Sequence, residues 1–398
     1  MINQVEKKNP KRRFKEFLGK ENWNVHTLGT VLMSMYNGQT PSRSKGEYWN
    51  GKINWLTSGE LNCGIVNDTF EKITELGLDS AKLKIIPKGI LVIAITGLEA
   101  SGTRGNCAIL GCNTTLNQSC MALFPIRSLI SSDFLFYWYL FIGDYYGIKY
   151  TQGTKQQSYN AKILNDLEIL IPSLDEQNKI SSFFSKLDSM IDFQKRKLDK
   201  LEATKKALLQ EIFPEEGQDK PKRRFKGFTG AWEQHKLKSI ANMIVAGGDI
   251  DKNKIKESGT YPVIANALSK DGIVGYYDDS YRIEAPAVTV TGRGDIGVAK
   301  ARHQNFTPVV RLLSLTTAHD VDFVEHAINN LKIVSESTGV PQLTVPQLSN
   351  YKIHITSIIE ERKIGLFISK LDNLITLHQR KLDKLKNLKQ AYLNEMFV

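Results

Sequence analysis

The sequence predicts an α+β protein in which two long, antiparallel, coiled-coil-like helices separate two mixed α/β domains, arranged as a pseudo-two-fold internal repeat. Three observations support this fold class. Ser185–Phe213 and Ser369–Phe397 align without gaps, with 16 identities in 29 positions. Pro10–Gly19 and Pro221–Gly230 form a second repeat, and strand-like runs fill the stretches between the repeats. Such a duplicated order indicates one scaffold made twice.

The repeats divide the 398 residues into six parts, which is consistent with two or three domains that each bury a core. We expect a basic N-terminal arm (1–22), a first globular domain (23–170), a first helix (171–213), a basic linker (214–231), a second globular domain (232–355) and a second helix (356–398). Pro214, Gly217 and Pro221 mark the linker as a break between elements.

The positive charge is concentrated in the two arms. Lys7–Lys20 has seven basic residues and one acidic residue, and Lys220–Lys226 has five basic residues and no acidic one. Together they account for the whole formal net charge of +11. Focused basic charge favours a polyanionic partner such as nucleic acid. The alternative is a pair of solvated linkers that only keep the protein soluble.

The two long helices are predicted from heptad spacing, with apolar residues repeating in steps of four and three. The residues predicted to form the seam between the helices are Leu187, Ile191, Leu198, Leu201, Leu208, Leu371, Ile375, Leu382, Leu385 and Tyr392. Polar residues interrupt it at equivalent places, Gln194 and His378, then Lys205 and Lys389. They either fix the register of the helices or lie at the rim of the seam.

Each helix has its own start signal. Ser173 with Glu176, and Ser357 with Glu360, fit a capping box in which a hydroxyl and a carboxylate satisfy free N–H groups. A helix of 29 residues is roughly 43 Å long, close to the 34–36 Å between half-sites on one face of DNA. The pair therefore has the length of a molecular ruler.

Alternating apolar runs predict strands in the globular stretches, for example Gly89–Thr96 and Ala285–Gly292. The run Phe134–Ile142 is too short to cross a membrane and predicts a buried helix with its N-cap at Ser132 or Asp133. The N-terminus has no apolar core typical of a secretory signal, so we expect a soluble cytoplasmic protein.

The sequence offers little support for catalysis or metal binding. Cys63, Cys107, Cys112 and Cys120 have no CxxC spacing, so we expect free, mostly buried thiols. "GRGDIG" (Gly292–Gly297) matches a dinucleotide motif, but more strands are expected after it rather than the helix that such a site needs. "GLEASGTR" (Gly97–Arg104) resembles a P-loop without its lysine. We find no Ser/His/Asp order and no paired carboxylates.

Both globular stretches place an arginine and a short polar residue in a glycine turn after a strand. Arg104-Gly105-Asn106 and Arg293-Gly294-Asp295 could read base edges, arginine with guanine and aspartate with cytosine. The alternative is a plain hairpin turn with an exposed arginine. Aromatic, hydroxyl and basic residues interleave in Thr40–Leu61, and Thr151–Asn160 offers amides and hydroxyls beside Lys155.

This layout resembles the specificity subunits of bacterial type I restriction–modification systems over essentially the whole chain. The strings that carry the resemblance are "GQTPSRSKGEYWNGKINWL", "LEILIPSLDEQNKI", "YPVIANALSKDGIVGYYDD" and "TGRGDIG", together with the tandem order of variable domain and repeated helix. Ile244–Ser258 lacks the TPS…YW…W string of the first domain. We therefore expect the two domains to read different sequences.

The resemblance implies two target-recognition domains that read the halves of a bipartite, asymmetric sequence in double-stranded DNA, and helices that set the spacer. It implies two modification subunits with S-adenosylmethionine, restriction subunits with ATP and Mg, and no catalysis or cofactor in this chain. The candidate DNA-binding residues are Thr40, Ser42, Arg43, Lys45, Trp55, Ser101, Thr103, Arg104, Asn106, Gln152, Lys155, Gln156, Asn266, Lys270, Tyr276, Arg293, Asp295, Lys300, Arg302 and Gln342. A self-contained DNA-modifying enzyme and a coiled-coil adaptor without a nucleic-acid role are the alternatives.

Overall fold

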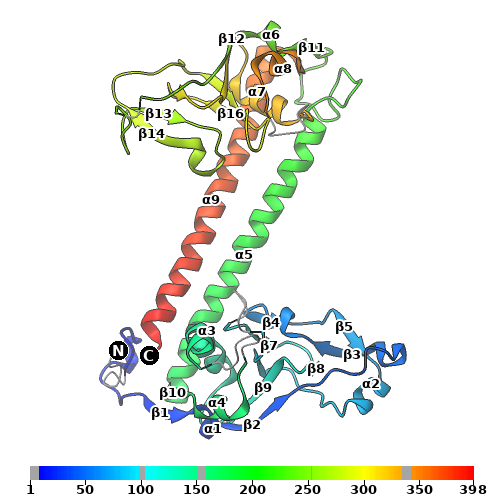
Figure 1. Ribbon diagram of the computed structural model, residues 1–398, viewed down its shortest axis with the longest axis vertical. Helices are drawn as coiled ribbons and strands as arrows, with labels where there is room; N and C mark the ends of the chain where they lie inside the picture. The colour runs from blue at the N-terminus through cyan, green and yellow to red at the C-terminus, as the bar shows by residue number, and fades with distance from the viewer. Residues whose placement is uncertain (1–8, 98–103, 151–157, 252, 334–341) are drawn as a thin grey trace. The chain divides into compact units, whose positions relative to one another are not determined.

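The computed structural model describes residues 9–97, 104–150, 158–251, 253–333 and 342–398 (Figure 1). The chain forms two compact units. Unit 1 comprises Met1–Phe193 and Leu382–Val398, and unit 2 comprises Gln194–Lys381. Each unit thus contains one globular part and a piece of both long helices. No helix among the described residues is long and apolar enough to cross a membrane.

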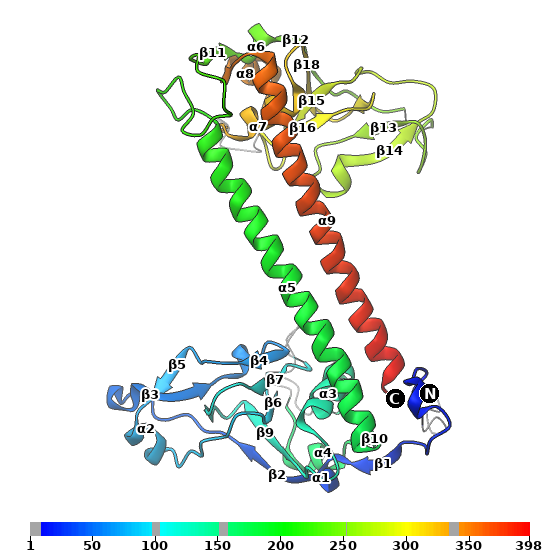
Figure 2. The ribbon, with the colours of Figure 1, turned by 180° about the vertical axis from the view of Figure 1, so that it is seen from behind.

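Unit 1 is built on a five-stranded sheet in the order β2-β9-β6-β7-β4, whose strands follow one another in Figure 2. Only β4 and β7 run parallel in it. A three-stranded sheet (β5-β3-β8) and the pair β1-β10 complete the unit. The elements are β1 (Asn24–Thr27), α1 (Leu28–Val31), β2 (Leu32–Asn37), β3 (Trp49–Leu56), β4 (Gly64–Val66), β5 (Glu71–Ile73), α2 (Glu75–Ser80), β6 (Leu91–Ala94), β7 (Cys107–Leu110), β8 (Thr115–Leu116), β9 (Cys120–Pro125), α3 (Ser132–Lys149), α4 (Ala161–Asp166) and β10 (Glu168–Ile171).

Unit 2 repeats this arrangement, with β13, β18 and α7 shorter than their counterparts β3, β9 and α3. Its sheets are β12-β18-β15-β16, β14-β13-β17 and β11-β19, the same sequence of pairings as in unit 1 except that β4 has no counterpart among the described residues. The elements are β11 (Glu233–Lys236), α6 (Leu237–Ile240), β12 (Ala241–Ala246), β13 (Tyr261–Ile264), β14 (Ile273–Tyr277), β15 (Ala287–Val290), β16 (Ala299–Arg302), β17 (Thr307–Pro308), β18 (Leu313–Thr317), α7 (Val321–Asn329), α8 (Val345–Asn350) and β19 (Lys352–Ile355). The internal repeat therefore extends into the globular parts, where the two halves of the sequence diverge.

The predicted strands and the predicted buried helix are present. The apolar run Gly89–Thr96 contains β6, and the run Ala285–Gly292 contains β15. Both strands are fully buried. Helix α3 covers the apolar run, but its N-cap is Ser131, whose hydroxyl accepts a hydrogen bond from Phe134 N at 3.1 Å. The predicted cap positions are one or two residues too late because Ser131 makes this bond. Strand β16 follows "GRGDIG", as expected.

The long helices are α5 (Leu174–Ile212) and α9 (Ile358–Met396), each of 39 residues. Ser173 and Ser357 cap the backbone N–H groups of Glu176 and Glu360, each at 3.4 Å. The serine half of each predicted capping box is therefore present. The glutamate half is wrong, because both carboxylates bind arginines of the basic arms instead.

In unit 1, Arg13 holds Glu176 in a bidentate ion pair, with Nε–Oε1 at 2.8 Å and Nη2–Oε2 at 2.6 Å. The Arg13 side chain is 7% exposed and the Glu176 side chain 2%. In unit 2, Arg224 holds Glu360 with both distances at 2.7 Å, and Glu360 is fully buried. Each arm is thus bound to the start of a long helix.

The neighbouring arginines bind the end of the other helix. Arg12 pairs with Glu395 near the end of α9, and Arg223 pairs with Glu211 near the end of α5. Backbone bonds of 2.8 Å accompany both pairs, from Arg12 N to Glu395 O and from Arg223 N to Glu211 O. At these four arginines the basic charge of the arms is therefore paired with carboxylates of the helices.

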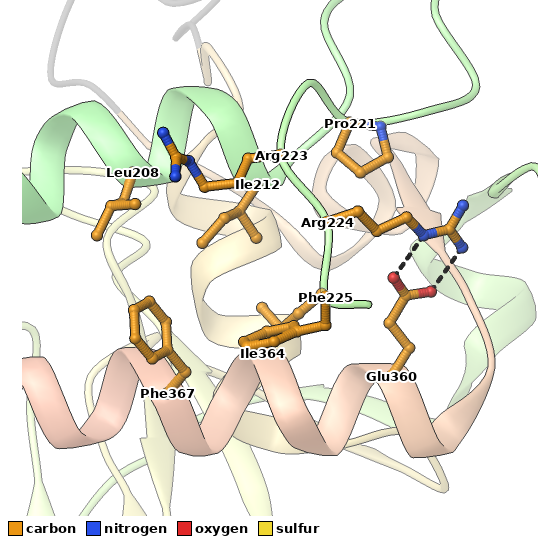
Figure 3. Close-up of a pocket in the computed structure, with 9 residues that line it drawn as sticks. All are labelled: Leu208, Ile212, Pro221, Arg223, Arg224, Phe225, Glu360, Ile364 and Phe367. Atoms are coloured by element: carbon orange, nitrogen blue, oxygen red, sulfur yellow. Dashed lines mark hydrogen bonds and ion pairs between the residues drawn. The ribbon is translucent and has the colours of Figure 1, made fainter. Parts of the chain in front are cut away.

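Aromatic residues complete the docking of each arm. Phe14 packs edge-on against Phe183 at 5.8 Å, and Phe225 packs in the same way against Phe367, also at 5.8 Å. Figure 3 shows the arm of unit 2 over α9, with the Arg224–Glu360 pair beside a pocket. The pocket is lined by Leu208, Ile212, Pro221, Arg223, Arg224, Phe225, Glu360, Ile364 and Phe367.

The helix segments of each unit run antiparallel. In unit 1, Phe183 contacts Tyr392 at 5.0 Å, and Asp188 binds Lys389 at 2.5 Å. In unit 2, Gln194 hydrogen-bonds to His378 at 2.8 Å. There Lys205 binds Asp372 at 2.5 Å. The four polar residues that interrupt the seam therefore all have partners on the opposite helix.

The structure places every predicted seam residue in a buried or half-buried position. Leu187, Leu198 and Leu382 are buried. The half-buried ones are Ile191, Leu201, Leu208, Leu371, Ile375, Leu385 and Tyr392.

Arg224→Met should lower the free energy of unfolding by roughly 3 kcal/mol, because it leaves the buried Glu360 carboxylate without its counter-charge. Chemical denaturation of the full chain measures this change. The control is Lys226→Met, which removes an exposed positive charge from the same arm. Equal stability of the two variants would contradict a structural role for the arm.

Leu208→Tyr should raise the free energy of unfolding by about 1 kcal/mol, since it fills the pocket of unit 2. The equivalent position in unit 1 is Tyr392, whose ring packs against Phe183 and under the Arg12 guanidinium. The reverse change, Tyr392→Leu, should be destabilising. Thermal unfolding of both variants tests the equivalence, and a destabilised Leu208→Tyr would count against it.

Candidate nucleic-acid interface

In unit 1 the most prominent candidate surface is an arginine stacked on two tryptophans. The Arg43 guanidinium lies 3.7 Å from the centre of the Trp49 ring and 5.0 Å from that of Trp55. Glu71 holds the same guanidinium in a bidentate pair, with Nη2–Oε2 at 2.8 Å, and the hydrogen bonds from Arg43 lower the pKa of Glu71. The Arg43 side chain is still 54% exposed. It is a fixed, planar cation of the kind that suits phosphate or guanine.

A turn inside β3 brings the two tryptophans together. Trp49 and Ile53 both pair with Ile73, so the strand is irregular between them. Asn50 has a left-handed φ of 60° at this point. The ring centres of Trp49 and Trp55 are consequently only 5.1 Å apart. The dipeptide Asn50-Gly51 is a turn signal, so the sequence held a sign of this arrangement.

Trp55 itself is not part of the exposed surface. Its side chain is 2% exposed and packs with Ile73 and Leu83, while its indole N–H donates to Gln39 O at 3.0 Å. The prediction that Trp55 contacts DNA is therefore wrong, because the residue is core. Ser42 and Lys45 are exposed beside Arg43 in the sequence, and Thr40 is half-buried. Thr40 is hydrogen-bonded to Gln118, Ser42 to Ser44 and Lys45 to Tyr48.

In unit 2 the candidate surface is a group of loops joined by Asn266. Its side chain donates to Val310 O at 2.5 Å and accepts from Gly292 N at 2.7 Å. The exposed Arg311 donates to Gln342 Oε1 at 2.7 Å. Arg293 and Gln342 form an isolated backbone bridge. Three predicted residues, Asn266, Arg293 and Gln342, are thus brought together although they are distant in sequence.

The other predicted residues of unit 2 have different roles. Lys300 pairs with Asp271, and this hydrogen bond lowers the pKa of Asp271. Lys270 is exposed and has a left-handed φ of 49°. Arg302 is half-buried and donates to Thr289 Oγ1 at 3.0 Å, and burial lowers its pKa. It is a weaker candidate for DNA contact than Lys270 or Lys300.

Tyr276 is half-buried in β14, and Asp295 is exposed in the turn after β15. The backbone carbonyl of Asp295 accepts a bond from Thr291. In unit 1 the corresponding turn holds Arg104 and Asn106, both half-buried. The Arg104 side chain packs closely over Gly147 of α3. Ser101, Thr103, Gln152, Lys155 and Gln156 lie outside the described residues.

Sequence reasoning missed Trp49, Glu71 and Arg311. Trp49 lies in the segment Thr40–Leu61, which is a candidate for binding, but its stacking against Arg43 depends on the turn at Asn50. Glu71 has no distinguishing pattern. Arg311 lies in an apolar run that reads as a strand, whereas both it and Val310 have positive φ, 64° and 48°. Within the described residues no group of three His, Cys, Asp or Glu side chains could hold a metal ion.

Comparison with known families decides what this scaffold is. The family described as type I restriction modification DNA specificity domain matches residues 20–203 and again 230–387. The chain belongs to this family. The two matched segments fall on the two halves of the internal repeat.

Individual members of the specificity family are similar at low identity. A type I specificity subunit of Mycoplasma pneumoniae is 27% identical over 220 residues, which cover 53% of this chain and 57% of that protein. The specificity subunit of the MjaVIII enzyme of Methanocaldococcus jannaschii is 22% identical over 414 aligned residues, covering 96% of this chain and 94% of that protein. The chain thus spans little more than half of the first of these relatives.

The fold matches a solved member. The crystal structure of the type I restriction–modification S subunit from Mycoplasma genitalium superposes with a TM-score of 0.70 at 16% identity, covering 98% of this chain and 99% of that one. A structure described for complex assembly and conformational transition of a type I system gives a TM-score of 0.53 at 16% identity, with 94% and 97% covered. The specificity-subunit fold is therefore shared.

Proposed function

We propose that this chain is the non-catalytic DNA-recognition subunit of a type I restriction–modification complex, and that each unit reads one half of a bipartite, asymmetric target. The observation that carries the proposal is a repeated scaffold with different exposed groups. Arm docking is the same in both units, and the sheet orders correspond apart from β4. The candidate surfaces differ, with Arg43 on tryptophans in unit 1 and the Asn266 loops in unit 2.

The exposed groups suit duplex DNA. Lys270 and Arg311 supply positive charge for phosphate contacts, which provide salt-dependent affinity without sequence preference, whereas Glu71 balances the charge of Arg43. Specificity would come from side chains that reach base edges, each good bidentate contact contributing roughly 1–3 kcal/mol. Because the two surfaces carry different residues, the two half-sites should differ in sequence.

Family membership supports a proposal for the partners. We propose that α5 and α9 set the length of the spacer and dock two modification subunits, which would carry S-adenosylmethionine and methylate the target. Restriction subunits that use ATP and Mg would complete the complex. Relatives named as specificity subunits of type I restriction enzymes support this assignment.

Replacing residues 23–150 with those of another family member should change one half of the methylated motif and leave the other half intact. The reason is that these residues include the Arg43 surface and none of the Asn266 loops. The measurement is methylome sequencing of cells that express the chain with its modification partner. Replacing residues 232–355 is the matched control and should change only the other half.

Two outcomes would favour the alternative functions. Methyl transfer by the isolated chain would indicate a self-contained DNA-modifying enzyme. Footprints of the chain with its modification partner that show no protected bipartite sequence would indicate an adaptor without a nucleic-acid role.

Inserting seven residues into both helices should lengthen the preferred spacer by about three base pairs, since a heptad adds about 10 Å of helix. The insertions belong after Phe193 and after Lys381, where the two units divide, so that each unit keeps its own contacts. Methylome sequencing gives the spacer length directly. A single insertion in α5 alone is the control and should impair assembly, whereas an unchanged spacer in the double insertion would refute the ruler.

A further inference from the structure

Two cysteines of unit 1 lie opposite each other on neighbouring strands. Cys107 opens β7, and Cys63 immediately precedes β4, which runs parallel to β7 with Gly64 paired to Ala108. The backbone N–H of Cys63 donates to Cys107 O at 2.9 Å. Neighbouring strands are spaced by roughly 4.8 Å, within the range of Cα separations that a disulfide spans. Both thiols are reduced in the structure.

The two thiols have unequal surroundings. Cys63 is exposed and has a left-handed φ of 56°, while Cys107 is completely buried. A non-glycine residue held in this conformation is uncommon and often marks a functional position. Oxidants from solvent can therefore reach the Cys63 thiol, whereas the Cys107 thiol is shielded from solvent.

The two thiols differ in acidity. Hydrogen bonds from the Cys107 side chain and backbone, aided by the Lys389 ammonium, lower the pKa of Cys63 to about 6. Burial raises the pKa of Cys107 well above its ordinary value, and the neighbouring Cys63 raises it further. Near neutral pH the pair is thus an exposed thiolate next to a buried thiol, the arrangement of a reactive cysteine with a resolving partner.

We propose that Cys63 is an oxidation site that peroxides modify and that Cys107 resolves to an intramolecular disulfide. The Cys63 thiolate attacks one peroxide oxygen, so an S–O bond forms, the O–O bond breaks, and the departing hydroxide takes from solvent the proton that Cys63 had released, leaving as water. Cys107 sulfur then attacks Cys63 sulfur, forming the S–S bond and breaking the S–O bond. The departing hydroxide takes the Cys107 proton as water. The two thiols lose two electrons in total, and hydrogen peroxide is reduced to two waters.

The second step is favoured by the first. The negative charge of Cys63 is one cause of the raised pKa of Cys107. Sulfenic acid is neutral, so its formation removes that charge and lets Cys107 lose its proton more readily.

Oxidation would also reach the candidate recognition turn. Cys63 Sγ lies 3.9 Å from Asn106 Oδ1, and Asn106 directly precedes Cys107 in the Arg104-Gly105-Asn106 turn. A disulfide bonds Cys63 Sγ to Cys107 and ties the end of this turn to β4. This consequence rests on the proposed function, and we expect weaker recognition of the half-site read by unit 1.

The chemistry is tested on the full chain with hydrogen peroxide and mass spectrometry. We expect a Cys63–Cys107 disulfide in the wild type, and in Cys107→Ser a sulfenic acid at Cys63 that dimedone traps. The internal control is Cys112, which is half-buried in the same unit. At pH 7 an ordinary thiol is a few per cent thiolate, so iodoacetamide should modify Cys63 at least about threefold faster, after allowing for the lower nucleophilicity of a low-pKa thiolate.

Modification of Cys63 at a rate equal to or below that of Cys112, or peroxide products without the 63–107 disulfide, would overturn the proposal. Because the alkylation rate is read on the wild type, a misfolded variant cannot obscure the result. This arm does not depend on DNA recognition, so it stands or fails separately from the proposed function.

The second arm measures DNA binding by the complex with its modification subunit before and after peroxide. Oxidation should lower the affinity for the cognate sequence several-fold, with recovery on reduction and no change in Cys63→Ser. Unchanged binding by a complex that has formed the disulfide would overturn the link to recognition. Absence of specific binding by the reduced complex would instead count against the proposed function.

Discussion

The architecture depends on a buried arginine–glutamate pair that is made twice. Glu176 and Glu360 lie in the first turn of a long helix and are almost fully removed from water. A carboxylate in that position interacts favourably with the helix dipole, but burying it without a counter-charge would be strongly destabilising. Arg13 and Arg224 supply that charge. Because each sits on an arm that precedes its globular part in sequence, the pair fixes where the chain enters each unit.

The same arms join segments that are far apart in the chain. Arg12 reaches Glu395 close to the C-terminus, so unit 1 is completed by the last residues of the protein. Trp23 and Phe134 pack against Phe397 in the same unit, and Trp232 packs against Phe213 in unit 2. Each unit therefore needs both helices to close its core. The Gln194–His378 and lysine–aspartate pairs add little net stability, but a register shift would leave them unpaired, so they specify alignment.

Sequence alone predicted the duplicated scaffold well, because helix caps, heptads and strand alternation are local signals. Sequence analysis failed where the role of a residue depends on a contact with a residue far away in the chain. The charge of the arms was plain, but nothing local shows that Arg13 meets a carboxylate 163 positions away. Trp55 has the composition of a binding residue, and only the tertiary structure shows it buried. Asn266, Arg293 and Gln342 were each predicted to bind DNA. That the three lie together follows from the order of the strands, which the sequence did not show.

The differences between the units lie outside the shared scaffold. Among the described residues, the main sheet of unit 2 has four strands, and β4 of unit 1 has no counterpart in it. Helix α3 has 18 residues, whereas α7 has nine. Cys63 stands at the start of that extra strand, and all four cysteines of the chain belong to unit 1. An oxidant acting on this pair would therefore modify unit 1 directly and leave unit 2 unmodified. Because the framework is repeated and the additional elements are not, unit 1 can carry a reactive cysteine pair while the contacts that hold unit 2 together stay unchanged.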